Sequence, residues 1–257
     1  MLLKPAHHRR IFLSGLLITI IGLPTSKFLM SVGQLILLGN WFLEGGLSTK
    51  FKTFFANKTA VILASVYLLH LLGLLWTEDF GYAFNDLRIK LPLLWLPLVL
   101  SSSPPVSRRQ LDKMLWVFIG ASLVSSLVST MIYSGCMQAI GLFKDGRISP
   151  FISHIRLSLL MVLAYLVLLR FSFRKTVNIK LKITTFILAL WFAVFLFILG
   201  AMTGIFIFFL VTFLLLCYFV FSLGVKPIKR LAIASVFLLM CLAMSMYVYR
   251  TVSAFLS

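Results

Sequence analysis

The sequence predicts an all-α protein, a polytopic transmembrane helical bundle of about nine crossings that forms one transmembrane domain over residues 1–257, with no soluble domain. Composition is the first indication. The chain is 61% hydrophobic and 12% charged, with a mean hydropathy of +1.08, whereas a soluble domain is about 45–50% apolar. The second indication is that apolar residues gather in runs long enough for membrane helices. This composition excludes a soluble enzyme, a disordered chain and a secreted disulfide scaffold.

Nine apolar runs are the expected crossings. A tight turn at Pro24–Lys27 joins the first two, and the first run is short for a bilayer. The fourth run contains Lys90, Pro92 and Pro97, which is typical of a broken or re-entrant segment. In chain order the runs are Ile11–Leu23, Phe28–Leu43, Ala60–Leu75, Ile89–Leu100, Leu115–Tyr133, Ile152–Leu169, Ile183–Leu199, Gly204–Leu223 and Leu231–Tyr249.

Positive charge is distributed unevenly between the runs. With the N-terminus in the cytoplasm, 17 of the 24 Lys and Arg residues fall in cytoplasmic segments, and four of the six acidic residues fall outside. This agrees with the positive-inside rule, so we expect the N-terminus inside and, after nine crossings, the C-terminus outside. The net charge of +18 comes from cations that lie between the apolar runs, where they set the orientation of the chain in the membrane. We therefore expect no nucleic-acid partner.

The stretch Trp76–Lys90 places charged side chains at the expected outer membrane face. On a helix, Asp86 and Lys90 lie four residues apart and can pair. Arg88 lies two residues from each of them and projects to another side of the helix; one candidate direction is the interior of the bundle. One interpretation is that Arg88, with Lys90 as a lesser candidate, binds a phosphate of a lipid-linked substrate, because a guanidinium offers phosphate two parallel hydrogen bonds. The alternative is an interfacial segment held by aromatic residues and ion pairs.

A second charged group, Lys144–Arg156, precedes the sixth run. We expect Pro150 to open the helix, which places His154 and Arg156 in its first turns on the outer side. A cation just inside a membrane helix is costly and usually faces a partner or a wet cavity. In one interpretation Arg156 binds a phosphate or pyrophosphate and His154 carries a proton or donates a hydrogen bond. In the other, both side chains reach out to the lipid headgroups.

Other motifs are few. Gly200 and Gly204 frame a short outer turn, so we expect the seventh and eighth crossings to form a close antiparallel hairpin. The cluster His7–Arg10 is interpreted as a cytoplasmic anchor. The three cysteines are far apart, and the sequence contains no P-loop, dinucleotide fingerprint or HExxH motif. Neither a metal nor a cofactor is therefore expected.

Three stretches carry a resemblance to a known family. The most specific are Asp86-Leu-Arg-Ile-Lys-Leu-Pro92, within Leu71–Pro104, and Ser153-His-Ile-Arg-Leu-Ser-Leu-Leu160; the segment Asn40-Trp-Phe-Leu-Glu-Gly45 adds to them. Together they resemble the bacterial O-antigen ligase/polymerase family, in the form found in Bacteroidetes-type sequences. The resemblance covers most of the chain.

The resemblance implies a multi-pass protein of the bacterial inner membrane that acts in cell-surface polysaccharide and lipopolysaccharide assembly. Such proteins are inverting glycosyltransferases that use neither a metal nor a nucleotide sugar. They take glycan from an undecaprenyl-pyrophosphate carrier at the periplasmic face and transfer it to lipid A core, another glycan chain or, in some members, a protein. The resemblance places Arg88, Lys90, His154 and Arg156 near the carrier, where cations stabilise a pyrophosphate leaving group.

The chain departs from the family pattern at two places. Family members often carry Ser-Arg-Thr-Gly where this chain has Ala201-Met-Thr-Gly204, so Met202 replaces a cation. Members also continue into a large periplasmic loop with Arg and His residues, followed by further helices, that completes the catalytic site. This chain ends where that loop would begin, so we expect a fragment, a truncated reading frame or a degenerate paralogue, whose 257 residues need not be active alone. Two other functions stay open: a transporter or flippase for a lipid-linked substrate, disfavoured by the few polar residues within the runs, and a non-catalytic membrane scaffold.

Overall fold

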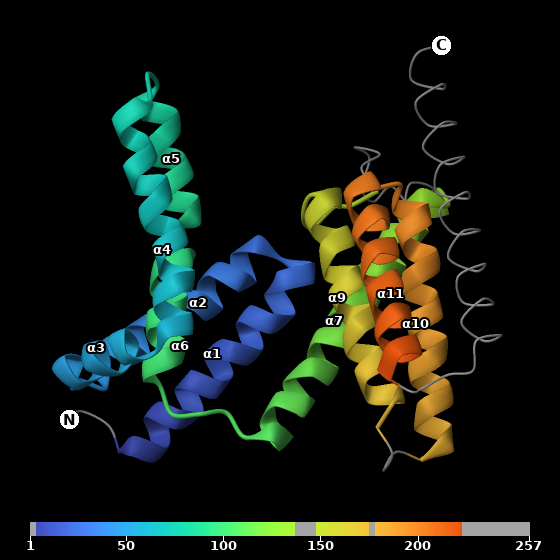
Figure 1. The fold of residues 1–257 in the computed structure, drawn as a ribbon, viewed down its shortest axis with the longest axis horizontal. Coiled ribbons are helices and arrows are strands. Elements are labelled where there is room, and N and C mark those ends of the chain that lie inside the picture. Colours follow the sequence, from blue (N-terminus) through green and yellow to red (C-terminus); the bar gives the residue numbers. More distant parts are fainter. Residues whose placement is uncertain (1–3, 137–147, 175–177, 223–257) are drawn as a thin grey trace. The chain divides into compact units, whose positions relative to one another are not determined.

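The computed structural model describes residues 4–136, 148–174 and 178–222, and these residues contain helices but no strand (Figure 1). This confirms the all-α class. The chain divides into two compact units, residues 1–118 and 119–257. The helices are α1 (Pro5–Thr25), α2 (Lys27–Leu43), α3 (Leu47–Ala56), α4 (Lys58–Leu72), the 3₁₀ helix η1 (Gly73–Trp76), α5 (Phe80–Lys90), α6 (Pro92–Ser102), α7 (Arg108–Tyr133), α9 (His154–Ser172), α10 (Ile179–Leu199) and α11 (Met202–Ser222).

Four of the described helical segments are long and apolar enough to cross a membrane: α4 continued by η1, α7, α9 and α10. A fifth is added if α2 and α3, which meet at 117°, count as one bent span. These segments support a membrane-embedded protein. Nine crossings and the orientation stay predictions, and the ninth run, Leu231–Tyr249, lies outside the described residues.

In the first unit, α1 and α2 form a close hairpin. The turn is tighter than the expected Pro24–Lys27, because only Ser26 separates the two helices and its hydroxyl accepts the amide hydrogen of Leu29 at 3.3 Å. Gly22 packs against the backbone of Met30, so a Cβ there would overlap it. Small residues thus permit the close approach of these helices.

The helical segment that contains the predicted fourth crossing extends beyond Ile89–Leu100. Asp79 caps α5 by accepting the amide hydrogen of Tyr82 at 2.9 Å, and Leu91, which links α5 to α6, keeps right-handed helical backbone angles. Residues 80–102 therefore form an almost continuous helical segment, roughly 35 Å long at 1.5 Å per residue. Figure 1 shows this segment running beside α4, which packs mainly against α6.

In the second unit, α9 and α10 form the main hairpin, and the hydroxyls of Ser172 and Thr185 lie 2.7 Å apart between them. The runs predicted as the seventh and eighth crossings fall in α10 and α11, which are joined at Gly200 and Ala201. These two helices contact each other, with the rings of Phe197 and Phe209 at 6.2 Å between centroids. The more extensive packing of α11 is against α9, where Gly204 lies against Ser158. The absence of a side chain at Gly204 therefore permits the close contact between α9 and α11.

Candidate functional site

The predicted phosphate binder Arg88 lies on α5, about 12 Å along the helix axis from its first residue at 1.5 Å per residue. Its side chain is exposed rather than directed into the helix bundle of its unit, and Nη2 donates to Asn85 Oδ1 at 2.8 Å. Asn85 is neutral, so this bond leaves the charge of Arg88 uncompensated. Among the described residues, no carboxylate forms an ion pair with it.

Lys90 behaves differently. Its Nζ lies 2.6 Å from Asp86 Oδ2, and both side chains are about one-third exposed, at 33% each. The pairing expected from the four-residue spacing is thus confirmed. Because Asp86 compensates its charge, Lys90 is the weaker of the two candidate anion-binding residues on α5.

An open pocket of about 380 Å³ lies between the end of α4, η1 and α5. Four of its lining residues have polar side chains: His70, Thr77, Tyr82 and Asp86. The Lys90–Asp86 ion pair therefore stands at the wall of this pocket. Hydroxyl, imidazole and carboxylate groups together can donate and accept hydrogen bonds, as a sugar hydroxyl requires.

His70 was not singled out by the sequence. Its Nδ1 lies 2.8 Å from the carbonyl oxygen of Val66. A carbonyl only accepts, so Nδ1 carries the hydrogen, and Nε2 of the neutral ring is left as an acceptor that can take a proton. The signal was weak in the sequence, because a lone histidine near the end of an apolar run shows no partner.

A second concavity, a groove of about 540 Å³, lies between α4 and α6. Its lining is mostly apolar and includes Leu63, Val66, Leu93 and Leu96. Along α4 the groove covers residues 57–66 and the polar pocket begins at Leu69. A mostly apolar groove and a pocket with four polar side chains thus follow one another along the same helix.

The other two predicted site residues lie in the second unit. His154 is the first residue of α9, and Arg156 lies in its first turn; both are exposed. The helix begins after Ser153, whose hydroxyl accepts the amide hydrogen of Arg156 at 3.5 Å, and not at Pro150 as expected. Because Arg88 and Arg156 belong to different units, their convergence on one cavity stays a prediction.

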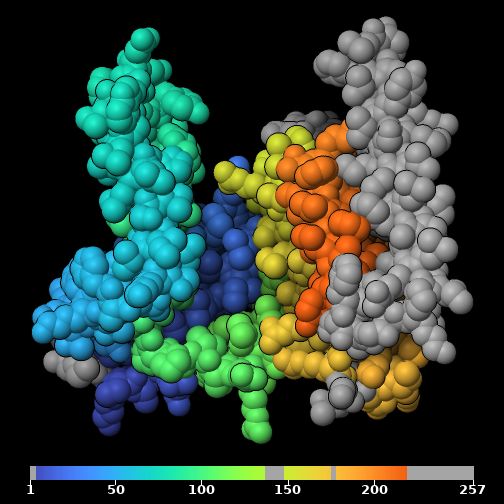
Figure 2. Space-filling view, viewed as in Figure 1, coloured from blue at the N-terminus to red at the C-terminus, as the bar shows by residue number. Residues whose placement is uncertain are grey.

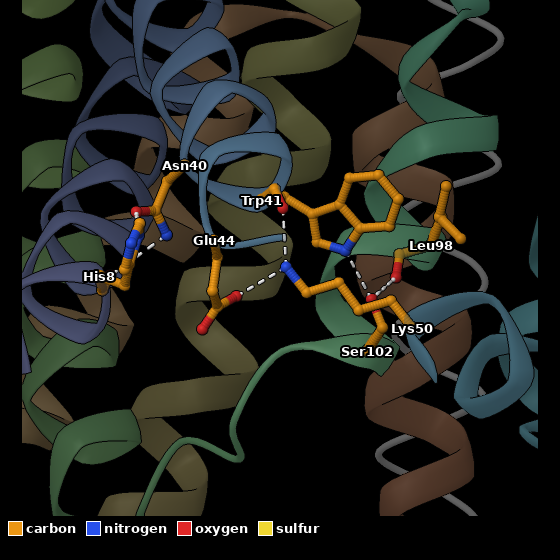
Figure 3. Close-up of polar contacts among 7 residues, drawn as sticks. All are labelled: His8, Asn40, Trp41, Glu44, Lys50, Leu98 and Ser102. Atoms are coloured by element: carbon orange, nitrogen blue, oxygen red, sulfur yellow. Dashed lines mark hydrogen bonds and ion pairs between the residues drawn. The ribbon is translucent and has the colours of Figure 1, made fainter. Parts of the chain in front are cut away.

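A buried polar network was also missed by the sequence interpretation (Figure 3). His8, placed in a cytoplasmic anchor, is 1% exposed, and its Nδ1 lies 2.8 Å from Asn40 Oδ1. The amide Nδ2 of Asn40 donates to the backbone oxygen of His8 at 3.2 Å. His8 Nε2 is buried without a hydrogen-bond partner. This network fastens the start of α1 to the end of α2.

Lys50, also counted as a cytoplasmic cation, belongs to the same end of the unit. Its Nζ donates to the backbone oxygen of Trp41 and pairs with Glu44, both at 2.7 Å. The indole nitrogen of Trp41 donates to Ser102 Oγ at 2.7 Å. In Figure 3 these side chains converge from α2, α3 and α6. Their role is to hold the three helices together.

Within the described ranges, no group of three or more His, Cys, Asp or Glu residues could hold a metal ion. Comparisons with protein families, with curated proteins and with solved structures found no match to this chain. The resemblance to the O-antigen ligase/polymerase family therefore enters below as a proposal.

Proposed function

We propose that this chain is an O-antigen ligase/polymerase-like protein of the bacterial inner membrane that takes glycan from an undecaprenyl-pyrophosphate carrier at the periplasmic face. One observation carries the proposal: a mostly apolar groove and a pocket with four polar side chains follow one another along α4. A lipid-linked glycan has the same order of parts, an apolar chain, a pyrophosphate and a sugar.

The groove between α4 and α6 suits the isoprenoid chain, because its mostly apolar lining can pack against hydrocarbon. The pocket suits the head of the carrier. Near it, Trp76 is 80% exposed and Tyr82 is 72% exposed. Exposed Trp and Tyr are enriched at membrane–water interfaces, so this end of α4 fits the interface where a glycan enters water.

Arg88 is the proposed phosphate ligand of the first unit, because its charge is uncompensated and its fork of donors matches two phosphate oxygens. Lys90 contributes less, since Asp86 already pairs with it. Arg156 and His154 are the corresponding proposed ligands of the second unit. The proposal requires all four to approach one carrier molecule.

In the proposed reaction, an acceptor hydroxyl oxygen attacks the anomeric carbon of the carrier-linked sugar. The new glycosidic bond forms as the bond from that carbon to the pyrophosphate oxygen breaks, and the configuration inverts. Undecaprenyl pyrophosphate leaves with the electron pair, and the cations stabilise its developing charge. Within the described pocket, His70 Nε2 is the group suited to accept the hydroxyl proton.

The test uses the full chain in vesicles supplied with an undecaprenyl-pyrophosphate-linked glycan and a glycan acceptor. We expect the full chain to bind the carrier, and the chain completed by the family's C-terminal part to form glycosylated acceptor and undecaprenyl pyrophosphate in equal amounts. Movement of intact glycan-linked carrier across the bilayer would instead assign a transporter. If the vesicles neither bind nor change the carrier, the proposed function is wrong and a scaffold role takes its place.

A further inference from the structure

The short helix α3 lies across the end of the first unit. It is bent by 117° from α2, and the two residues that make the bend, Gly45 and Gly46, have φ angles of 74° and 66° that other residues rarely adopt. At this end α1 begins, α2 and α6 end, and α4 starts right after α3. Figure 1 shows α3 at the end of α4 opposite to α5. Its position is thus the level at which the apolar helices of this unit stop.

One face of α3 is fixed against the unit. Lys50 is 8% exposed and Phe54 is 7% exposed. Lys50 bonds to Glu44 and to the carbonyl of Trp41, and Phe54 packs with Ala60 and Ala64 of α4. The rotation of α3 about its own axis is therefore determined, and so is the direction of its other faces.

A neighbouring face carries a stripe of exposed apolar side chains. Leu47, Phe51 and Phe55 are spaced four residues apart and are 39%, 42% and 67% exposed. At 100° per residue they cover an arc of about 80° next to the buried face. Thr49 and Thr53 lie on the opposite side and are exposed. In Figure 2, α3 lies at the surface of its unit. Contact of this stripe with water would be unfavourable, so we expect an apolar environment to cover the stripe.

Positive charge gathers at this end of the unit. Exposed cations lie in α3 and near the starts of α1, α4 and α7: Arg9, Arg10, Lys52, Lys58, Arg108, Arg109 and Lys113. Arg9 donates to Gln110 at 3.4 Å, which ties the start of α1 to the start of α7. Two acidic residues lie at this end, and one of them, Glu44, is paired with Lys50. The charge around α3 therefore complements an anionic surface.

We propose that α3 is an interfacial amphipathic helix, with its Leu47–Phe51–Phe55 stripe seated among the acyl chains and the surrounding cations on anionic phospholipid headgroups. Such helices lie in the plane of the interface, with the apolar face about 5–10 Å into the headgroup and acyl boundary. Lysine and arginine side chains near an anionic membrane surface are attracted to it. This inference is independent of the proposed glycan transfer. It assigns α3 to the membrane surface rather than to a bent span with α2.

The test measures depth at single spin labels on the full chain, with Cys136, Cys217 and Cys241 replaced by alanine. Labels replace Leu47, Phe51 or Phe55 in the stripe and Thr49 or Thr53 as matched controls on the same helix. The bilayer is phosphatidylcholine with phosphatidylglycerol. We expect the stripe labels to collide mainly with oxygen, which enters lipid, at a depth of about 5–10 Å. The Thr49 and Thr53 labels should collide mainly with a water-soluble nickel chelate.

Four results would contradict the proposal. Stripe labels that collide with the chelate as often as the threonine labels would place the stripe in water. Labels shielded from both reagents would indicate a covering protein or a second copy of the chain. A depth of about 15 Å, the centre of a core about 30 Å thick, would make α3 part of a re-entrant span. In phosphatidylcholine alone the labels should move outward, and an unchanged depth would refute the role of anionic lipid.

Discussion

The ammonium group of Lys90 lies 2.6 Å from the carboxylate of Asp86, one helical turn away on α5. This ion pair distinguishes Lys90 from Arg88, which lies two residues away in the sequence. Asp86 compensates the charge of Lys90 at the wall of the pocket, whereas Arg88, within the part of the chain that the structure describes, bonds to the neutral amide of Asn85. The account therefore assigns anion binding on α5 chiefly to Arg88.

The orientation of the chain is a first prediction. Reporter fusions after Lys113 and after Lys182 should report the cytoplasm, and a fusion after Ser257 should report the periplasm, because cations gather on the cytoplasmic side. Activity of alkaline phosphatase and of a cytoplasmic reporter distinguishes the two sides. A cytoplasmic signal at Ser257 would mean that one expected crossing does not cross.

The His8–Asn40 contact should contribute to stability. His8→Ala leaves the buried Asn40 oxygen without its 2.8 Å partner, which costs about 1–3 kcal/mol of unfolding free energy. His7→Ala is the matched control, because His7 is exposed and adjacent; its effect should stay within about 0.5 kcal/mol. Denaturant unfolding of the purified chain in detergent measures both. Equal effects of the two substitutions would contradict the network.

The contact of Gly204 with Ser158 should limit what position 204 tolerates. A Cβ there would overlap the Ser158 side chain, so Gly204→Ala should destabilise the chain by about 1–3 kcal/mol. Gly39→Ala is the control: a Cβ there meets nothing within 4 Å, and removing a helical glycine should stabilise by about 0.5–1 kcal/mol. Adding Ser158→Gly to Gly204→Ala should restore most of the loss. Thermal unfolding in detergent that shows no restoration would argue against this contact.

Much of the fold followed from apolar runs and local signals. The run Leu115–Tyr133 lies within α7 and Ile183–Leu199 within α10, because long apolar segments fold as helices whatever their partners. The Asp86–Lys90 pair also followed, since four-residue spacing alone brings the two side chains together. The predicted run began at Ile89 and not at the start of α5, although the capping residue Asp79 is present in the sequence. The charged residues of α5 interrupt the apolar pattern, so its continuity with α6 was not recognised.

The buried polar contacts could not be predicted in the same way. His8 and Asn40 are 32 positions apart, and Trp41 and Ser102 are 61 apart. Such pairs depend on how α1, α2 and α6 pack, which no local pattern encodes. In the sequence, Lys50 resembles a surface anchor because it lies between two apolar runs, in a segment with other lysines. Its burial follows from the sharp bend at Gly45 and Gly46, which turns α3 back onto α2.

The most direct test of the central claim is the affinity of the full chain, in lipid nanodiscs, for undecaprenyl pyrophosphate. Arg88→Ala should weaken binding about tenfold or more, since a hydrogen bond to a charged group contributes about 1.5–3 kcal/mol. Arg88→Lys should recover only part of this loss, and Arg10→Ala, which changes an exposed cation at the other end of the unit, should bind as the unchanged chain does. Equal affinity of the Arg88→Ala variant and the unchanged chain would contradict the account.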